Sequence, residues 1–121
     1  MLSSTLEADV NQLHAGLCAG LADPKRILLL YTLAERPLSV NDLAAAAGMP
    51  QSSTSRHLRV LRERGMVSAV RQGQSVQYRV ADARLIQALD LLRGVLRDHL
   101  AKRADLIDQL AAAEPAEAAQ A

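Results

Sequence analysis

The sequence contains neither phenylalanine nor tryptophan, and Tyr31 and Tyr78 are its only tyrosines. A folded core therefore has to be built from aliphatic side chains. Alanine and leucine dominate the composition, and both favour helix over sheet. A chain of 121 residues is long enough for one domain with one modest core.

The chain has a single cysteine, Cys18, which excludes an internal disulfide framework and a Cys-x-x-Cys zinc site. It also lacks an apolar run near the roughly 18 residues that a membrane span needs. Its first residues do not combine a basic segment with an apolar run, as a signal peptide would. We expect a soluble cytoplasmic protein.

Acidic residues are scarce in the middle of the chain. Residues 24–80 hold nine Lys/Arg and three Asp/Glu, a net charge of +6, whereas the remaining residues carry a net charge of −5. A basic middle between acidic ends predicts a polyanionic partner for the middle, with a solvated charged surface as the alternative.

Apolar periodicity and capping residues predict five helices and one hairpin. Asp23-Pro24, Ser39 and Asp82 begin helices, while Gly48 and Gly65 end them. The first helix carries one apolar stripe, and the second is apolar nearly all round and therefore expected to be buried. The expected helices span residues 4–21, 24–36, 40–47, 51–64 and 83–110.

The pattern changes to alternation in residues 75–80, where Val76, Tyr78 and Val80 predict a half-buried strand. Residues 66–70 form its expected partner, and residues 71–74 the turn between them. We predict one domain over residues 1–112, with a helix-turn-helix at about 40–64, a wing at about 66–81 and a flexible tail at 113–121.

Two short helices separated by Gly48-Met49-Pro50 and followed by a hairpin indicate a winged helix-turn-helix, mainly α with a small β-hairpin. The second helix of such a pair presents its N-terminal residues to the major groove of DNA, where short polar side chains reach base edges. Arginines farther along neutralise phosphates. The predicted DNA contacts are Gln51, Ser52, Ser53, Ser55, Arg56, His57, Arg59, Arg62, Arg71, Gln72 and Gln74.

Helical spacing divides this helix into two faces. Thr54, Leu58 and Leu61 are expected to face the core, whereas the serines, Arg56 and His57 face the groove. Serine-rich helix starts also occur simply because serine caps helices, so the prediction depends on the serines, the basic flank and the hairpin together.

Three segments, LADPKR, QSSTSRHLRVLRERGMV and RQGQSVQYRV, follow one another in the order typical of one protein family. Residues 21–80 resemble the winged helix-turn-helix core of the ArsR/SmtB repressors. The resemblance implies a homodimeric repressor that binds an inverted repeat in double-stranded DNA and is released by an effector. It also implies that helices 4–21 and 83–110 form the dimer interface. Pro50 stands where the family often has serine, and it still suits a helix start.

The resemblance also implies where a metal would bind, because two sites recur in the family. One uses cysteines on the helix before the recognition helix, where this chain reads Pro37-Leu38-Ser39-Val40-Asn41-Asp42-Leu43 without a thiol. The other uses the start and middle of the last helix, where the matching residues are Asp82, Arg84, Val95 and Asp98. Arg84 repels a cation and Val95 has no ligand atom, so neither family site is expected to bind a metal.

His14, Cys18 and His99 are the remaining candidate effector residues. His14 and Cys18 are four residues apart on one helix, and His99, with Asp98 nearby, lies on the helix expected to neighbour it in a dimer. A metal ion or a redox signal is one interpretation. The alternative is that Cys18 is a small buried hydrophobe and His14 an ordinary partly exposed side chain.

Catalysis is not expected, because no base is paired with a nucleophile and no glycine-rich phosphate loop is present. His57 lies among arginines, which favour its neutral form. A winged helix that binds proteins in place of DNA is the alternative function, and the concentration of positive charge in residues 24–80 argues against it.

Overall fold

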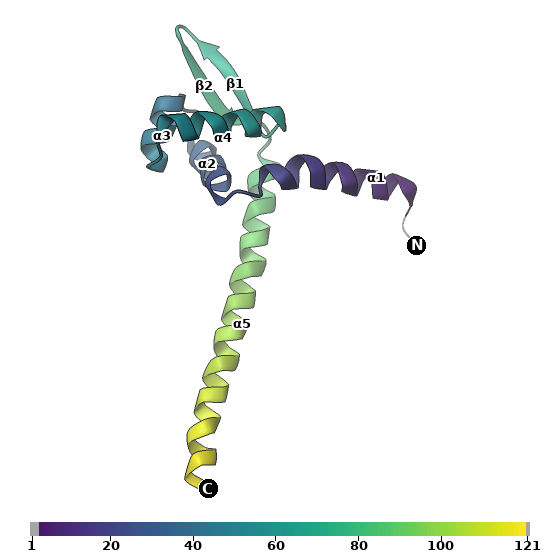
Figure 1. Cartoon of the computed structure of the whole chain (residues 1–121), viewed down its shortest axis with the longest axis vertical. Helices are drawn as coiled ribbons and strands as arrows, with labels where there is room; N and C mark the ends of the chain where they lie inside the picture. The colour runs from purple at the N-terminus through teal and green to yellow at the C-terminus, as the bar shows by residue number, and fades with distance from the viewer. Residues whose placement is uncertain (1–2, 121) are drawn as a thin grey trace. The chain divides into compact units, whose positions relative to one another are not determined.

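The computed structural model describes residues 3–120, and the side chains as far as residue 113. The chain separates into two compact units, Met1–Ile86 and Gln87–Ala121. One domain over residues 1–112 stays a prediction. The first unit carries most of the elements (Figure 1). The second consists of most of the last helix, α5 (Arg84–Gln120).

The helices of the first unit are α1 (Ser4–Leu13), α2 (Pro24–Glu35), α3 (Val40–Ala47) and α4 (Gln51–Glu63). Of these, α2 and α3 begin at the predicted capping residues, and Gly48 ends α3 as predicted. The side chains of Asp23 and Ser39 accept hydrogen bonds from the first turns of α2 and α3. Gly48 ends α3 with a φ of 65°, the left-handed conformation that glycine adopts without strain.

The predicted helix over residues 4–21 is not uniform. After α1, residues His14–Cys18 form a π-helical turn, η1, before the chain reaches α2. Local periodicity does not distinguish such a turn from an α-helix. A π-turn inside a helix leaves a carbonyl without its usual partner.

The hairpin consists of β1 (Val67–Gln72) and β2 (Ser75–Val80), which pair antiparallel with Val67 opposite Val80 and Gln72 opposite Ser75. The loop is only Gly73-Gln74, so the predicted four-residue turn over residues 71–74 was too long. Gly73 has a φ of 62°, which permits a two-residue connection. Leu38 adds one further backbone bridge, to Tyr78 of β2.

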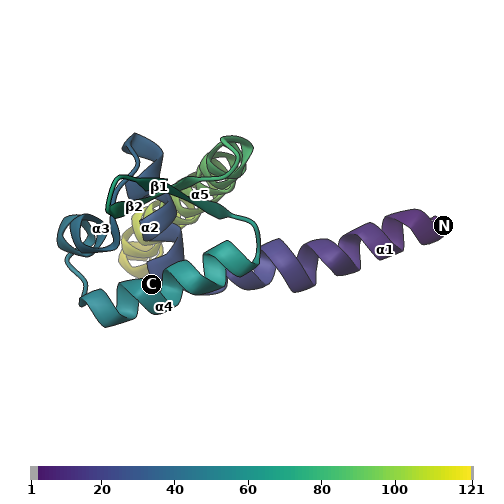
Figure 2. The ribbon, with the colours of Figure 1, turned by 90° about the horizontal axis from the view of Figure 1, so that it is seen from above.

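The core of this unit is aliphatic, as the absence of phenylalanine and tryptophan predicted. Helix α2 contacts α3, α4 and β2, and α4 also packs on β1. Figure 2 shows α2, α3 and α4 gathered beside the hairpin, and α1 extending away beyond the C-terminal end of α4. The most deeply buried side chains are Leu29, Leu30, Leu43, Leu58, Leu61 and Met66.

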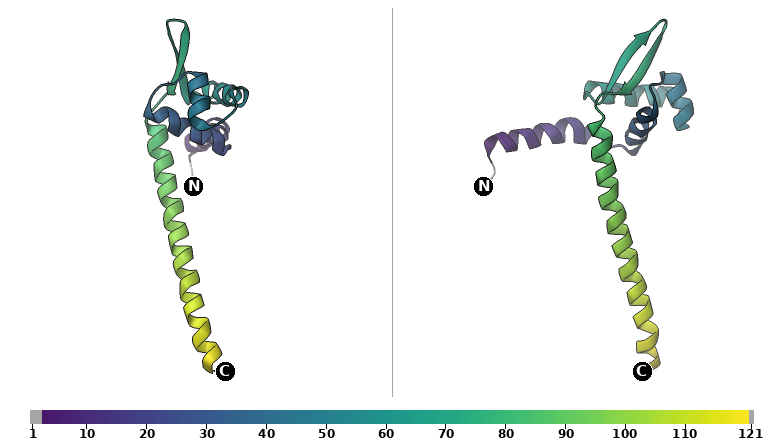
Figure 3. Two further views of the ribbon diagram at one scale, coloured as in Figure 1. Left: turned by 90° about the vertical axis from the view of Figure 1, so that its left-hand side faces the viewer. Right: turned by 180° about the vertical axis from the view of Figure 1, so that it is seen from behind.

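Two apolar residues lie outside the core, against expectation. Leu28 of α2 is 60% exposed, so this helix is not buried all round. Val76 is 39% exposed, because it belongs to the end of the hairpin that projects beyond the helices (Figure 3). The alternation in β2 therefore predicted the strand correctly and overestimated its burial.

Helix α5 spans Arg84–Gln120, ten residues beyond the predicted end at residue 110 and through most of the expected tail. Its start is fixed by Asp82, whose carboxylate accepts a hydrogen bond from the backbone N–H of Arg84. Within residues 3–120, no helix is both long and apolar enough to cross a lipid bilayer. Many apolar side chains of α5 are exposed, namely Leu91, Leu92, Val95, Leu96, Leu100, Leu106, Ile107 and Leu110.

Candidate nucleic-acid interface

The N-terminal end of α4 is open to a ligand. Pro50 precedes the helix and provides no side-chain cap, so backbone N–H groups of the first turn have no partner from a capping side chain. The first regular helical hydrogen bond of α4 is made by Thr54, whose N–H donates to the Pro50 carbonyl. Free N–H groups and the helix dipole together attract anions such as phosphate.

The predicted division of α4 into two faces is confirmed for the core side. Thr54, Leu58 and Leu61 are buried, and the Thr54 hydroxyl donates to the Pro50 carbonyl at 3.0 Å. The opposite side is polar and exposed. It carries Gln51, Ser52, Ser55, Arg56, Arg59 and Arg62.

His57 does not face outward, and this part of the prediction was wrong. Its side chain is only 15% exposed, with Nε2 4.0 Å from Oδ2 of Asp23 at the start of α2. Ser53, one turn earlier on the same flank, is half-buried. The start of α2 lies against this flank, which the helical spacing of α4 alone could not reveal.

Burial lowers the pKa of His57 below its ordinary value of 6.5, because the charged imidazolium loses solvation there. The nearby Asp23 carboxylate opposes this shift, while Arg26, Arg56 and Lys25 add to it. His57 is therefore neutral near pH 7.

We expect His57 to make the protein less stable as the pH falls below 6.5. Below that value the unfolded chain takes up a proton on this histidine, whereas the folded chain does so only at lower pH, so protons favour unfolding. Well above 6.5 the side chain is neutral in both states and contributes no pH dependence. Urea denaturation at pH values on both sides of 6.5 measures the effect. His57→Gln should flatten the curve in this range, and His14→Gln, at an exposed histidine, should not.

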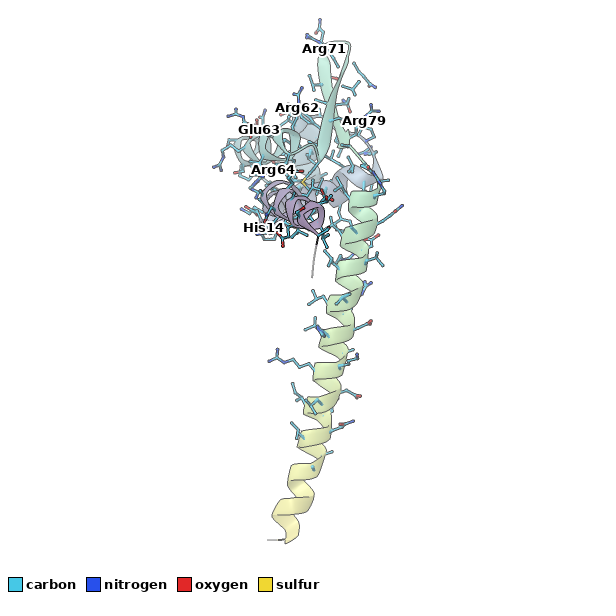
Figure 4. The ribbon with its side chains drawn as sticks, turned by 90° about the vertical axis from the view of Figure 1, so that its right-hand side faces the viewer. His14, Arg62, Glu63, Arg64, Arg71 and Arg79 are labelled. Carbon is cyan, nitrogen blue, oxygen red and sulfur yellow. The ribbon has the colours of Figure 1, made fainter. Side chains whose placement is uncertain are left out.

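A hollow of about 450 Å³ separates the exposed side of α4 from β2. It is lined by Ser55, Leu58, Arg59, Arg62 and Glu63 of α4 and by Tyr78 of β2. Figure 4 shows Arg62 and Glu63 on α4, with Arg71 near the tip of the hairpin. Glu63 was not among the predicted site residues, although it is the only acidic residue in α4.

The hairpin presents further polar groups. Arg71, Gln72 and Gln74 are exposed around its tip, as predicted for a wing. Arg79 of β2 is also exposed, with Nε 3.4 Å from the Ser68 hydroxyl, and it was missing from the predicted contacts. Each strand therefore contributes one exposed arginine to the wing.

Two of the nine basic residues in the basic middle are engaged elsewhere. Arg26 donates to the carbonyls of Ala19 and Gly20, and Arg64 donates to those of Ala15 and Gly16. Their donors are directed at protein carbonyls, so the net charge of residues 24–80 overstates the charge available to a polyanion.

The candidate effector residues are separated between the two units. His14 and Cys18 are exposed on η1, and His99 belongs to the second unit. The alternative prediction, that Cys18 is a small buried hydrophobe, is wrong for the single chain, in which Cys18 is exposed. Among the residues that the structure describes, no three His, Cys, Asp or Glu side chains gather to hold a metal ion.

The start of α5 gives a physical reason why a cation does not suit Asp82. The Arg84 guanidinium lies 2.7 Å from its carboxylate, and this hydrogen bond lowers the pKa of Asp82 to about 2. The carboxylate that would ligate a metal is thus already paired with a cation of the chain. Ser39 and Asn41, at the other position typical of a metal site, supply no thiolate.

Comparisons with known proteins agree on one kind of protein. Residues 23–69 match the model of the family described as bacterial regulatory protein, arsR family. The chain is 41% identical over 88 residues to the HTH-type transcriptional regulator NmtR of Mycobacterium tuberculosis, and the aligned region covers 73% of each protein. It is 39% identical over 95 residues to the transcriptional repressor SmtB homolog of Synechocystis, covering 78% of this chain and 69% of the other.

A solved structure supports the same fold. The homodimeric winged helix-turn-helix DNA-binding domain of Mb0332 from Mycobacterium bovis superimposes with a TM-score of 0.71 at 30% identity. The match covers 82% of this chain and 91% of that domain.

Proposed function

This chain belongs to the arsR family of bacterial regulatory proteins, and on that basis we propose that it is a DNA-binding transcriptional regulator that represses its target as a homodimer. Because these relatives are named as a transcriptional regulator and a transcriptional repressor, we propose that this chain is a regulator without enzymatic activity. Because its ligand would be the chromosome, we place its action in the cytoplasm.

The observation that carries the proposal is the exposed, uncapped start of α4 beside a basic hollow and a wing. Short side chains at Ser52 and Ser55 allow the helix axis to approach base edges closely. Farther along the helix, Arg59 and Arg62 lie where phosphates would flank the groove. The wing adds Arg71, which is exposed near the tip of the hairpin (Figure 4).

A dimer would give this interface a second copy and therefore two half-sites. Leu6, Val10 and Leu13 of α1 are 42–50% exposed in the single chain, and the large apolar side chains of α5 from Leu91 to Leu110 are 54–74% exposed. Apolar surface of this extent is typical of a protein interface. A two-fold symmetric dimer binds a DNA sequence that is itself an inverted repeat.

The test is fluorescence anisotropy of labelled duplexes with the purified protein. We expect weak binding to mixed-sequence DNA that falls steeply with salt, and much tighter binding to a duplex chosen from a random library. The selected duplex should contain two half-sites in inverted orientation. Absence of binding at low salt would contradict the proposal and favour a winged helix that binds proteins.

Arg56 and Arg71 should affect binding in different ways. If Arg56 reads a base, Arg56→Ala should cost about 1–3 kcal/mol and relax the sequence preference at one position of each half-site. Arg71→Ala in the wing should instead weaken binding to every sequence alike and reduce the salt slope by about 0.9 for each phosphate that the variant no longer neutralises. Anisotropy titrations at several salt concentrations measure both. An Arg56→Ala protein with unchanged affinity and preference would show that the outer face of α4 is not in the groove.

Glu63 should limit affinity, because its carboxylate lies in the same hollow as Arg59 and Arg62. Glu63→Gln should tighten binding by up to about fivefold, since two like charges 4 Å apart in water repel by about 1 kcal/mol. The gain should shrink as salt is raised. Glu35→Gln, at the exposed end of α2, removes the same charge elsewhere and should have little effect.

For release from DNA, we propose that an effector acts through the first and last helices. The thiol of Cys18 and the imidazole of His14 are exposed on η1, and the partner's His99 is the third candidate group. The test is the metal content of the purified protein, together with DNA affinity before and after added metal ions or oxidants. A Cys18→Ser protein that still responds would assign the effector to other residues.

A further inference from the structure

The C-terminal end of α4 is joined to the first helical segment by a side chain. Arg64, the residue that follows α4, extends its guanidinium to η1, where Nη1 donates to the carbonyls of Ala15 and Gly16. Figure 4 shows Arg64 beside the helical segment that carries His14. The two partners are 49 residues apart in the sequence, so this is a tertiary link between elements.

The π-turn explains why a carbonyl is available for this contact. In an α-helix the N–H of Ala19 would donate to the carbonyl of Ala15. Here it donates to His14 and Gly16 instead, so the Ala15 carbonyl loses its usual helical donor. The Arg64 guanidinium supplies a replacement donor at this exposed carbonyl, and its second hydrogen bond, to the Gly16 carbonyl, is partly buried.

The same segment is held at two further points. Gly20 is buried, and a Cβ placed on it would lie 2.7 Å from Sδ of Met66 and 3.0 Å from Cδ of Arg64, so only glycine fits without a shift. From α2, Arg26 donates to the Gly20 carbonyl at 2.7 Å and to the Ala19 carbonyl at 3.2 Å. Residues 15–20 are therefore hydrogen-bonded by Arg26 of α2 and by Arg64 at the end of α4, and Gly20 also packs closely against Met66 before the hairpin.

We propose that Arg64 is a positioning residue for DNA recognition, which makes η1 and α4 move together and so transmits a displacement of the first helix to α4. This inference rests on the proposed DNA-binding function. Arg64 acts without touching DNA, because its guanidinium reaches to η1, where Nη1 donates to two protein carbonyls. Coupling of this kind is reciprocal, so DNA bound at α4 also stabilises the docked state of η1.

The first variant is Arg64→Ala, and its matched control is Arg36→Ala. Arg36 carries the same charge, is exposed, and has no hydrogen bond or ion pair to another described residue. On a duplex that the wild type binds, we expect Arg64→Ala to lower affinity by about tenfold, within the range of typical coupling, with the salt slope unchanged. A phosphate contact would instead reduce the salt slope by about 0.9.

Hydrogen exchange followed by mass spectrometry distinguishes coupling from a purely structural role of Arg64, because only coupling predicts that DNA slows amide exchange in η1. In the wild type, DNA should slow amide exchange in residues 14–22, although this segment does not line the hollow. In Arg64→Ala, DNA should still slow exchange at the start of α4 and no longer in residues 14–22. Arg36→Ala should behave like the wild type.

Two further variants keep the proposal testable if Arg64→Ala fails to fold. Arg64→Lys retains a donor and should recover part of the affinity that the alanine variant lacks. Gly20→Ala displaces η1 by steric overlap without changing charge, and it should reproduce the loss of affinity at an unchanged salt slope.

The outcomes separate this proposal from the proposed function. A wild type that binds no duplex would contradict DNA binding itself. A wild type that binds, with Arg64→Ala equal to Arg36→Ala in affinity or with a reduced salt slope, would overturn the positioning role alone. The same holds if DNA leaves exchange in residues 14–22 of the wild type unchanged.

Discussion

Leu96→Glu should convert the protein from a dimer into monomers and abolish tight binding to an inverted-repeat duplex. Leu96 lies on α5 with Leu92 and Leu100, about one turn away on either side, and the three side chains are 54–61% exposed in the single chain. Full burial of such a side chain stabilises an interface by about 1.5–3 kcal/mol, and a carboxylate at its centre must lose its solvation without a partner. Sedimentation velocity at micromolar concentration measures the change.

The matched control is Ala101→Glu, which introduces the same charge at an exposed position of the same helix, on a different side from Leu96. This protein should remain dimeric. Wild-type protein that sediments as a monomer, or a dimeric Leu96→Glu protein, would show that the apolar face of α5 has another role.

Leu58→Ala should destabilise the first unit by about 2–5 kcal/mol, a large part of the stability of a domain of this size. Leu58 is 1% exposed and belongs to the buried face of the recognition helix, where its removal leaves a cavity. Denaturation in urea followed by circular dichroism measures the free energy of unfolding.

Leu28→Ala provides the comparison, since the same side chain is removed from α2 at a position that is 60% exposed. We expect a change within about 0.5 kcal/mol, as is usual for surface substitutions. Equal effects at the two positions would contradict the placement of Leu58 in the core and of Leu28 at the surface.

Much of the candidate site could be predicted because its signals are local. Pro50 and Gly65 bound the recognition helix through their own backbone preferences, and Ser39 caps α3 with its own hydroxyl. The spacing of Thr54, Leu58 and Leu61 defines a buried face because they lie on one side of an α-helix. The alternation in residues 75–80 likewise identifies a strand from its own side chains.

Other features of the site depend on residues far away in the sequence. His57 is covered because Asp23 and the start of α2 lie beside it, 34 positions earlier in the chain. Glu63 shares a hollow with Tyr78 only because β2 lies next to α4. Periodicity reports which side of a helix is apolar, and it carries no information on which element covers each flank.

The sequence by itself determined the order of the elements, the aliphatic core and the polar leading turn of the recognition helix, because propensity, capping and periodicity act over a few neighbouring residues. Only the tertiary structure decided which arginines are available to a polyanion. Arg59 and Arg62 remain exposed, whereas Arg26 and Arg64 bind the carbonyls of residues 15–20. All four are alike as sequence letters, and they differ because the carbonyls around the π-turn come within reach of only some of them in the folded chain.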